Sequence, residues 1–89
     1  MIVTEKEQEV LKKLKGTKEG AVLRHMILKK DGITGDTAYT EYHLYRLAGA
    51  IHKLKHIHGM DIVTVPEGKQ GYARYKMARH ATPAERGEL

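Results

Sequence analysis

Side chains that can bind an anion recur between positions 45 and 56 of this chain at the spacing of a helix. At about 100° per residue, one side of such a helix carries Tyr45, Arg46, Gly49, His52, Lys53 and His56. No carboxylate falls on that side. Guanidinium, ammonium and imidazole groups donate hydrogen bonds to phosphate oxygens and to the acceptor atoms of bases. The pattern therefore predicts a surface that meets a polyanion.

Two of the histidines also have a spacing that can chelate a metal ion. His52 and His56 lie one helical turn apart, and imidazole is a common ligand of zinc and copper. His58 is close in sequence but points well away from this pair, and no carboxylate on the same side completes a ligand set. We therefore predict no metal site and expect the pair to contact phosphates or bases.

Catalytic chemistry has few candidates in the sequence. The chain contains no serine, no cysteine, no glycine-rich phosphate loop before a helix and no pair of acids that the pattern places together. We predict a binding protein without a cofactor rather than an enzyme. The absence of cysteine favours a reducing compartment. No apolar run approaches the ~18 residues that span a bilayer, and the start lacks the layout of a secretion signal, so the expected location is the cytoplasm.

Positive charge is concentrated in the second half of the chain. The formal net charge is +5, and residues 43–80 hold seven Lys/Arg against two Asp/Glu. Residues 1–42 hold eight Lys/Arg against seven Asp/Glu and are nearly neutral. A patch of this sign attracts nucleic acid by counterion release. A solvated basic surface that maintains solubility would show the same excess, so charge indicates a class of partner without identifying one.

The helix that positions the basic side chains is predicted over residues 44–58. Its inward side carries Leu44, Leu47, Ala48, Ile51, Leu54 and His58. A short helix over residues 37–42 precedes it, capped by Thr34 or Asp36. Because only a short turn separates the two helices, we expect them to cross steeply, as in a helix-turn-helix.

Further helices are predicted in the N-terminal third. Thr4 and Glu7 fit a capping box that begins a helix, and Gly16 is a natural end for it. A second helix over residues 17–30 follows. One bent or continuous helix over residues 4–30 is the alternative, and the sequence leaves the choice open.

Alternating residues after the basic helix predict a β-hairpin. Strands over residues 60–65 and 72–78 flank a turn over residues 66–71, whose glycines can take positive φ. Lys69 and Gln70 would lie at the tip of this hairpin.

The remaining segments are less regular. Ile33 is predicted to form a very short strand or a plug between two glycines, and Tyr39 is expected in the core. Residues 81–89 show no periodicity and contain proline and glycine, so we predict a disordered tail after a single domain over residues 1–80.

Short motifs in residues 30–77 occur in an order that is typical of a known family. They are GIT at 32–34, Ala38, YRLAGAIHKLK at 45–55, GMDIVT at 59–64 and GY at 71–72. Their order resembles that in the small winged helix-turn-helix DNA-binding proteins of bacteriophages and prophages. Lys55 departs from the pattern, because the family often has arginine there. The resemblance implies a mainly α fold of the α+β class with a C-terminal β-hairpin, made of three to four helices and a two-stranded wing.

The resemblance also implies roles for individual residues. The helix over residues 44–58 would enter the major groove, and the wing over residues 66–71 would contact the flanking minor groove or backbone. The candidate nucleic-acid-binding residues are Thr34, Thr37, His43, Tyr45, Arg46, His52, Lys53, His56, Lys69, Gln70 and Arg74. Thr34, Thr37 and His43 are assigned to phosphates because they lie near predicted helix starts.

The expected function is that of a small sequence-selective binder of double-stranded DNA, acting as a transcription regulator or as a phage accessory factor. The alternative is a protein-binding winged helix that docks on a host enzyme or complex through the same basic face. A homodimer would bury more surface than so small a core provides alone. The sequence does not distinguish activation from repression, recombination or replication.

Overall fold

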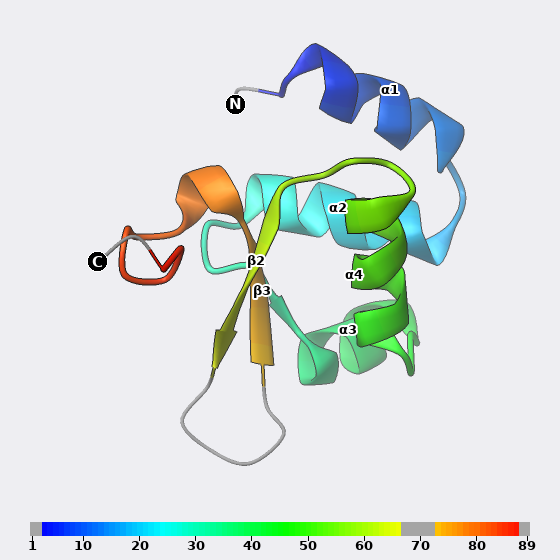
Figure 1. The fold of residues 1–89 in the computed structure, drawn as a ribbon. Coiled ribbons are helices and arrows are strands. Elements are labelled where there is room, and N and C mark those ends of the chain that lie inside the picture. Colours follow the sequence, from blue (N-terminus) through cyan, green and yellow to red (C-terminus); the bar gives the residue numbers. More distant parts are fainter. Residues whose placement is uncertain (1–2, 67–72, 88–89) are drawn as a thin grey trace.

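The structure, a computed structural model, describes residues 3–66 and 73–87 (Figure 1). Within them the chain forms the helices α1 (Glu5–Lys13), α2 (Lys18–Leu28), α3 (Gly35–Tyr42) and α4 (Leu47–His56), the strands β1 (Ile33–Thr34), β2 (Ile62–Pro66) and β3 (Ala73–Met77), and the 3₁₀ helix η1 (Ala78–His80). The predicted α+β class is confirmed. The strands are not confined to the predicted C-terminal hairpin, because β1 belongs to the same sheet; of the two alternatives for Ile33, the short strand is the one present.

Local hydrogen bonds explain where the first two helices begin. The Thr4 hydroxyl accepts from the Glu7 amide at 3.1 Å, and Glu7 Oε1 accepts from the Thr4 amide at 3.2 Å, so the predicted capping box is present. The Thr17 hydroxyl caps α2 by accepting from the Gly20 amide at 3.1 Å, without a reciprocal side-chain bond. The chain turns between the two helices at Gly16, where φ is +83°. Residues 4–30 therefore hold two helices.

The close approach of α1 to α2 depends on a glycine. A Cβ atom placed on Gly20 would lie 2.3 Å from the Leu14 carbonyl oxygen, which is far inside van der Waals contact. Gly20 therefore has a packing role between the two helices.

The sheet is antiparallel with the order β1-β3-β2. Ile33 pairs with Tyr75, and β2 runs alongside β3 from Ile62 opposite Met77 to Pro66 opposite Ala73. β1 can reach this position because Gly32 adopts φ +76°, and a Cβ atom there would lie 2.1 Å from the Tyr75 carbonyl oxygen.

The core is centred on α2, which lies between α1 and α3 in Figure 1 and packs against α4. The largest fully buried side chains are Val22, Leu23, Met26, Ile33 and Leu54. They come from α2, β1 and α4, so burial of apolar area holds the basic helix against the helix at the centre of the fold. No described helix has the length and hydropathy needed to cross a membrane.

The described part of the C-terminal segment folds back on the domain. Ala81 is buried, Lys76 Nζ lies 2.9 Å from Glu85 Oε2, and Arg86 Nη1 donates to the Ala81 carbonyl at 3.0 Å. The sequence predicts a disordered tail from residue 81, because these contacts are individual hydrogen bonds and one ion pair, which leave no periodic pattern in the sequence.

Candidate nucleic-acid interface

α4 is amphipathic, and its inner side is fixed by four buried residues. Leu47, Ala50, Ile51 and Leu54 are at most 5 % exposed and recur with the spacing of one helical face. The helix begins at Leu47, three residues later than predicted. Placing Ala48 on the inner side is wrong, since Ala48 is exposed and Ala50 is buried instead. The predicted inward side includes Leu44, which precedes the helix, and this moves the centre of that side toward Ala48.

The outer side of α4 is the side that the sequence analysis predicts to be exposed. Opposite the buried residues lie Gly49, His52 and His56, all exposed. The two imidazole rings have centroids 4.4 Å apart and planes tilted by 42°. Lys53 and Lys55 are also exposed and lie to either side of this line. No acidic residue occurs between positions 42 and 60, so α4 itself contributes no carboxylate to this face.

Lys55 belongs to this face although it is not among the predicted site residues. Lys55 lies beside His52 at three residues, or about 60°, around the helix. The predicted inward side includes Leu44 and His58, which lie outside the helix, and this shifts its centre toward Lys55.

One flank of the face reaches the start of α2. Lys53 Nζ lies 3.6 Å from a carboxylate oxygen of Glu19, and both side chains are partly exposed. Lys18 Nζ donates to the His43 carbonyl at 2.9 Å. His43 ends α3 in the left-handed conformation with φ +55°. Its predicted place at a helix start is therefore wrong, because the turn after α3 begins with it.

The turn between α3 and α4 presents an aromatic ring and a guanidinium. Tyr45 is 77 % exposed, and its ring packs edge-on against Tyr39 with centroids 5.1 Å apart. Tyr39 is itself 52 % exposed, so its predicted place in the core is wrong. Arg46 is the N-cap residue of α4 and its side chain makes no capping hydrogen bond.

A shallow depression connects this turn to the sheet. It has a volume of about 740 Å³ and lies between the starts of α3 and α4 and strand β3. Its lining includes Tyr39, Tyr45, Arg46, Gly49 and Tyr75, together with the carboxylate of Asp36. Aromatic rings, a guanidinium and a small residue thus border one concave surface next to the outer side of α4.

The two threonines assigned to phosphates are occupied by their own helix. The Thr34 hydroxyl accepts from the Thr37 amide at 3.3 Å and donates to the Thr37 hydroxyl at 3.2 Å. Thr34 is thereby the N-cap of α3. The exposed carboxylate of Asp36 lies in the same first turn, which makes this helix start less favourable for an anion.

The candidate residues of the hairpin lie apart from the α4 face or outside the described residues. Arg74 Nη1 donates to the Asp31 carbonyl at 3.1 Å, at the turn before β1. Lys69 and Gln70 fall within residues 67–72, which lie outside the described part of the chain. The structure therefore brings together Tyr45, Arg46, His52, Lys53 and His56, and holds Arg74 in a separate contact.

Groups that could hold a metal ion are not assembled here. Among residues 3–66 and 73–87, no three or more side chains of His, Cys, Asp and Glu lie close enough to bind one ion. The exposed α4 face, with its imidazole, ammonium and guanidinium donors, can donate hydrogen bonds to an anionic partner.

Comparison with known proteins does not assign the chain to a group. No family model, no curated protein and no solved structure matches it.

Proposed function

We propose that this protein is a winged helix that binds double-stranded DNA by inserting α4 into the major groove. The observation that carries the proposal is the outer side of α4, where His52, His56 and Lys55 are exposed while the opposite side is packed into the core. Tyr45 and Arg46 extend the same surface at the start of the helix. This is a binding function and requires no catalytic group.

The arrangement of elements supports the fold part of the proposal. The order in the chain from α2 onward is α2, β1, α3, α4, β2 and β3, which is the order of elements in a winged helix. The four-residue turn 43–46 separates α3 from α4, as in a helix-turn-helix. β2 and β3 run antiparallel next to each other and lead toward the region that would form the wing.

Dimensions and charge favour duplex DNA as the partner. α4 has ten residues and is therefore about 15 Å long. A helix with its side chains is about 10–12 Å across, and the major groove of DNA is about 12 Å wide. Imidazole, ammonium and guanidinium groups can donate to phosphates and to the acceptor edge of guanine there. A transcription regulator or an accessory factor of a phage-type system would use such a face.

The salt dependence of binding to a random DNA duplex tests the proposal. Several phosphate contacts should make the affinity fall with salt at a slope of about −0.9 per contact on logarithmic axes. Lys55→Ala should reduce this slope by about 1. Lys13→Ala removes an equally charged, exposed lysine from α1 and should leave the slope unchanged. A flat plot for the unmodified protein would end the proposal.

Selection of bound duplexes from a random pool then tests sequence selectivity, and palindromic sites would indicate a dimer. If the protein shows no duplex binding at low salt but captures the same protein partner after nuclease treatment, the basic face would serve protein recognition instead.

A further inference from the structure

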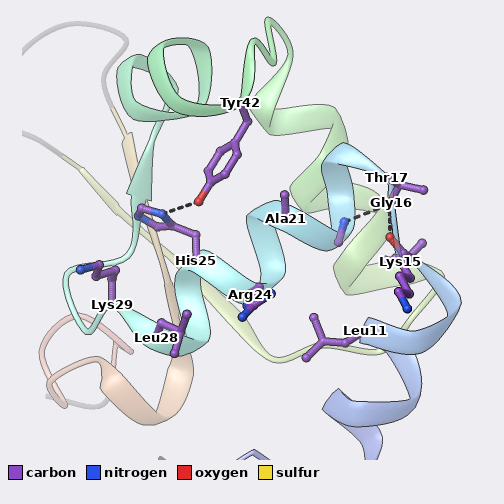
Figure 2. A pocket seen from close by; sticks show the side chains of 12 residues that line it. Leu11, Lys15, Gly16, Thr17, Ala21, Arg24, His25, Leu28, Lys29 and Tyr42 are labelled. Carbon is purple, nitrogen blue, oxygen red and sulfur yellow. Dashed lines mark hydrogen bonds between the residues drawn. The ribbon is translucent and has the colours of Figure 1, made fainter.

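A second concave surface lies along the side of α2 that faces away from the core. Figure 2 shows it between α1, which contributes Leu11, and the end of α3, which contributes Tyr42. Its volume is about 840 Å³, and no residue of α4 lines it. This groove is therefore separate from the surface proposed to bind DNA.

The floor of the groove has the pattern of a helix-binding surface. Ala21, Arg24, His25 and Leu28 follow each other along α2 at i, i+3, i+4 and i+7. Leu28 is 49 % exposed although it is a large apolar side chain inside the last turn of a helix. Partly buried leucines of α1 extend the apolar surface beside it. Leu28 and these leucines give the groove an apolar surface, bordered by polar groups, that apolar side chains of a partner could cover.

The rim of the groove is positively charged. Lys15 and Lys29 line it together with Arg24 of α2, and no aspartate or glutamate is among the described residues that line it. None of these three forms an ion pair with another described residue. A second copy of the chain docked through the same groove would bring these like charges together. The charge therefore favours an acidic occupant over self-association.

One end of the groove is closed by a hydrogen bond between two helices. His25 Nδ1 and the Tyr42 hydroxyl are 2.9 Å apart, and their rings meet edge-on at 5.7 Å (Figure 2). Burial raises the pKa of the Tyr42 hydroxyl, and the nearby Glu41 raises it further. The phenol and the imidazole together form a polar wall between α2 and α3 at this end of the groove.

We propose that the groove along α2 is the docking site of an acidic amphipathic helix from a partner protein. Apolar side chains of the partner would pack on Ala21 and Leu28, and its carboxylates would pair with Lys15, Arg24 and Lys29. α2 has eleven residues and is about 16 Å long, so it can accommodate about three turns of a partner helix. The protein would then hold a partner on one side while α4 stays free on another.

Three labelled helical peptides of 14 residues test this proposal. The first has leucine at i, i+3, i+4 and i+7 with glutamate at the flanking positions, the second has lysine in place of glutamate, and the third has alanine in place of leucine. Fluorescence anisotropy should show at least tenfold tighter binding of the first peptide than of the other two. Amide chemical-shift changes should map to Leu11–Thr17, Ala21–Lys29 and Tyr42.

Variants of exposed residues locate the binding site without disturbing the core. Leu28→Glu should weaken binding of the leucine–glutamate peptide at least tenfold, and Arg24→Glu should move the preference toward the lysine peptide. Ile57→Glu changes another exposed apolar residue, 69 % exposed at the end of α4, and should have no effect. Circular dichroism of each variant would test whether it is folded.

Several outcomes would overturn the proposal. They are equal affinity for the glutamate and lysine peptides, shift changes confined to α4, or no saturable binding. Sedimentation showing a dimer that Leu28→Glu dissociates would assign the groove to a second copy of the chain. Saturable binding of dodecanoate at Leu28 together with exclusion of the peptides would assign it to a small amphiphile.

Discussion

The carboxylate of Glu7 in α1 and the guanidinium of Arg79 in η1 form an ion pair between segments that are 72 residues apart. Arg79 Nη2 donates to Glu7 Oε1 at 2.9 Å, and Nη1 pairs with the second carboxylate oxygen. Glu7 is 4 % exposed and also accepts from the Thr4 amide of the capping box. One acid thus stabilises both the start of α1 and its attachment to the segment after β3.

Arg79→Ala should lower the free energy of unfolding by about 1–3 kcal/mol, because it leaves a buried carboxylate with fewer partners. Urea denaturation measures the change. The double variant Glu7→Ala/Arg79→Ala should be more stable than the sum of the single changes predicts, since removing both partners leaves no unpaired charge. Additive losses would show that the two groups are not coupled.

Gly49→Ala and Gly20→Ala should change stability in opposite directions. A Cβ atom on Gly49 meets no atom within 4 Å, and alanine favours a helix over glycine by about 1 kcal/mol. On Gly20 the same atom would collide with the Leu14 carbonyl, so we expect a loss of about 1–3 kcal/mol. Thermal unfolding of the two variants under one condition measures both.

Gly49→Ala also separates stability from binding. Because Gly49 lies on the outer side of α4, the added methyl group should weaken duplex binding even as it raises the melting temperature. A variant with a raised melting temperature and unchanged duplex affinity would show that DNA does not approach α4 at this residue.

Arg46→Ala should relax base preference in a duplex selection, because a guanidinium at the start of the recognition helix can bind two acceptors of guanine. Arg24→Ala removes the same charge from the groove along α2 and should leave the preference unchanged. Lys69→Ala, in the predicted wing, should weaken binding to all sequences about equally. An unchanged sequence profile for Arg46→Ala would remove Arg46 from base recognition.

Glu85→Gln should make stability less dependent on acid pH. Backbone and side-chain hydrogen bonds from Thr82 and Lys76, with the backbone bond of Thr82 the largest cause, lower the pKa of Glu85 below its ordinary value of 4.5. A lowered folded-state pKa adds stability above 4.5, and this stability is lost as the pH falls through the folded-state pKa.

The unmodified protein should therefore melt higher than Glu85→Gln at pH 7, and the difference should shrink below pH 4.5. A difference that is constant between pH 7 and pH 3 would contradict this account. Glu9→Gln, which changes an exposed acid in α1, is the matched control.

Local signals in the sequence predicted the helices well. The capping threonines at positions 4 and 34, and the glycine that follows α1, act on their immediate neighbours and can be recognised without tertiary structure. The apolar stripe of α4 likewise predicted which side of it is exposed. The sequence leaves open whether Ile33 forms a strand or a plug. A strand of two residues is too short to show an alternating pattern, and its partner Tyr75 lies far along the chain.

Features that depend on distant partners were missed or misplaced. Tyr39 packs against Tyr45 on the surface because the chain turns at His43, which adopts a left-handed conformation. The residues next to Tyr39 in the sequence do not indicate this turn. The groove along α2 was not predicted either. Its walls come from three helices, and the residues exposed on α2 fall between apolar positions of the same helix.

The position of β3 in the middle of the sheet has a consequence for how the chain folds during synthesis. β3 is the last of the three strands to leave the ribosome, and both others pair only with it. A domain generally folds as a unit, so the sheet is completed only after β3 has emerged. Until residue 77 is available β1 and β2 lack their partner strand, so a released chain that ends before that point would leave the edges of both strands unpaired.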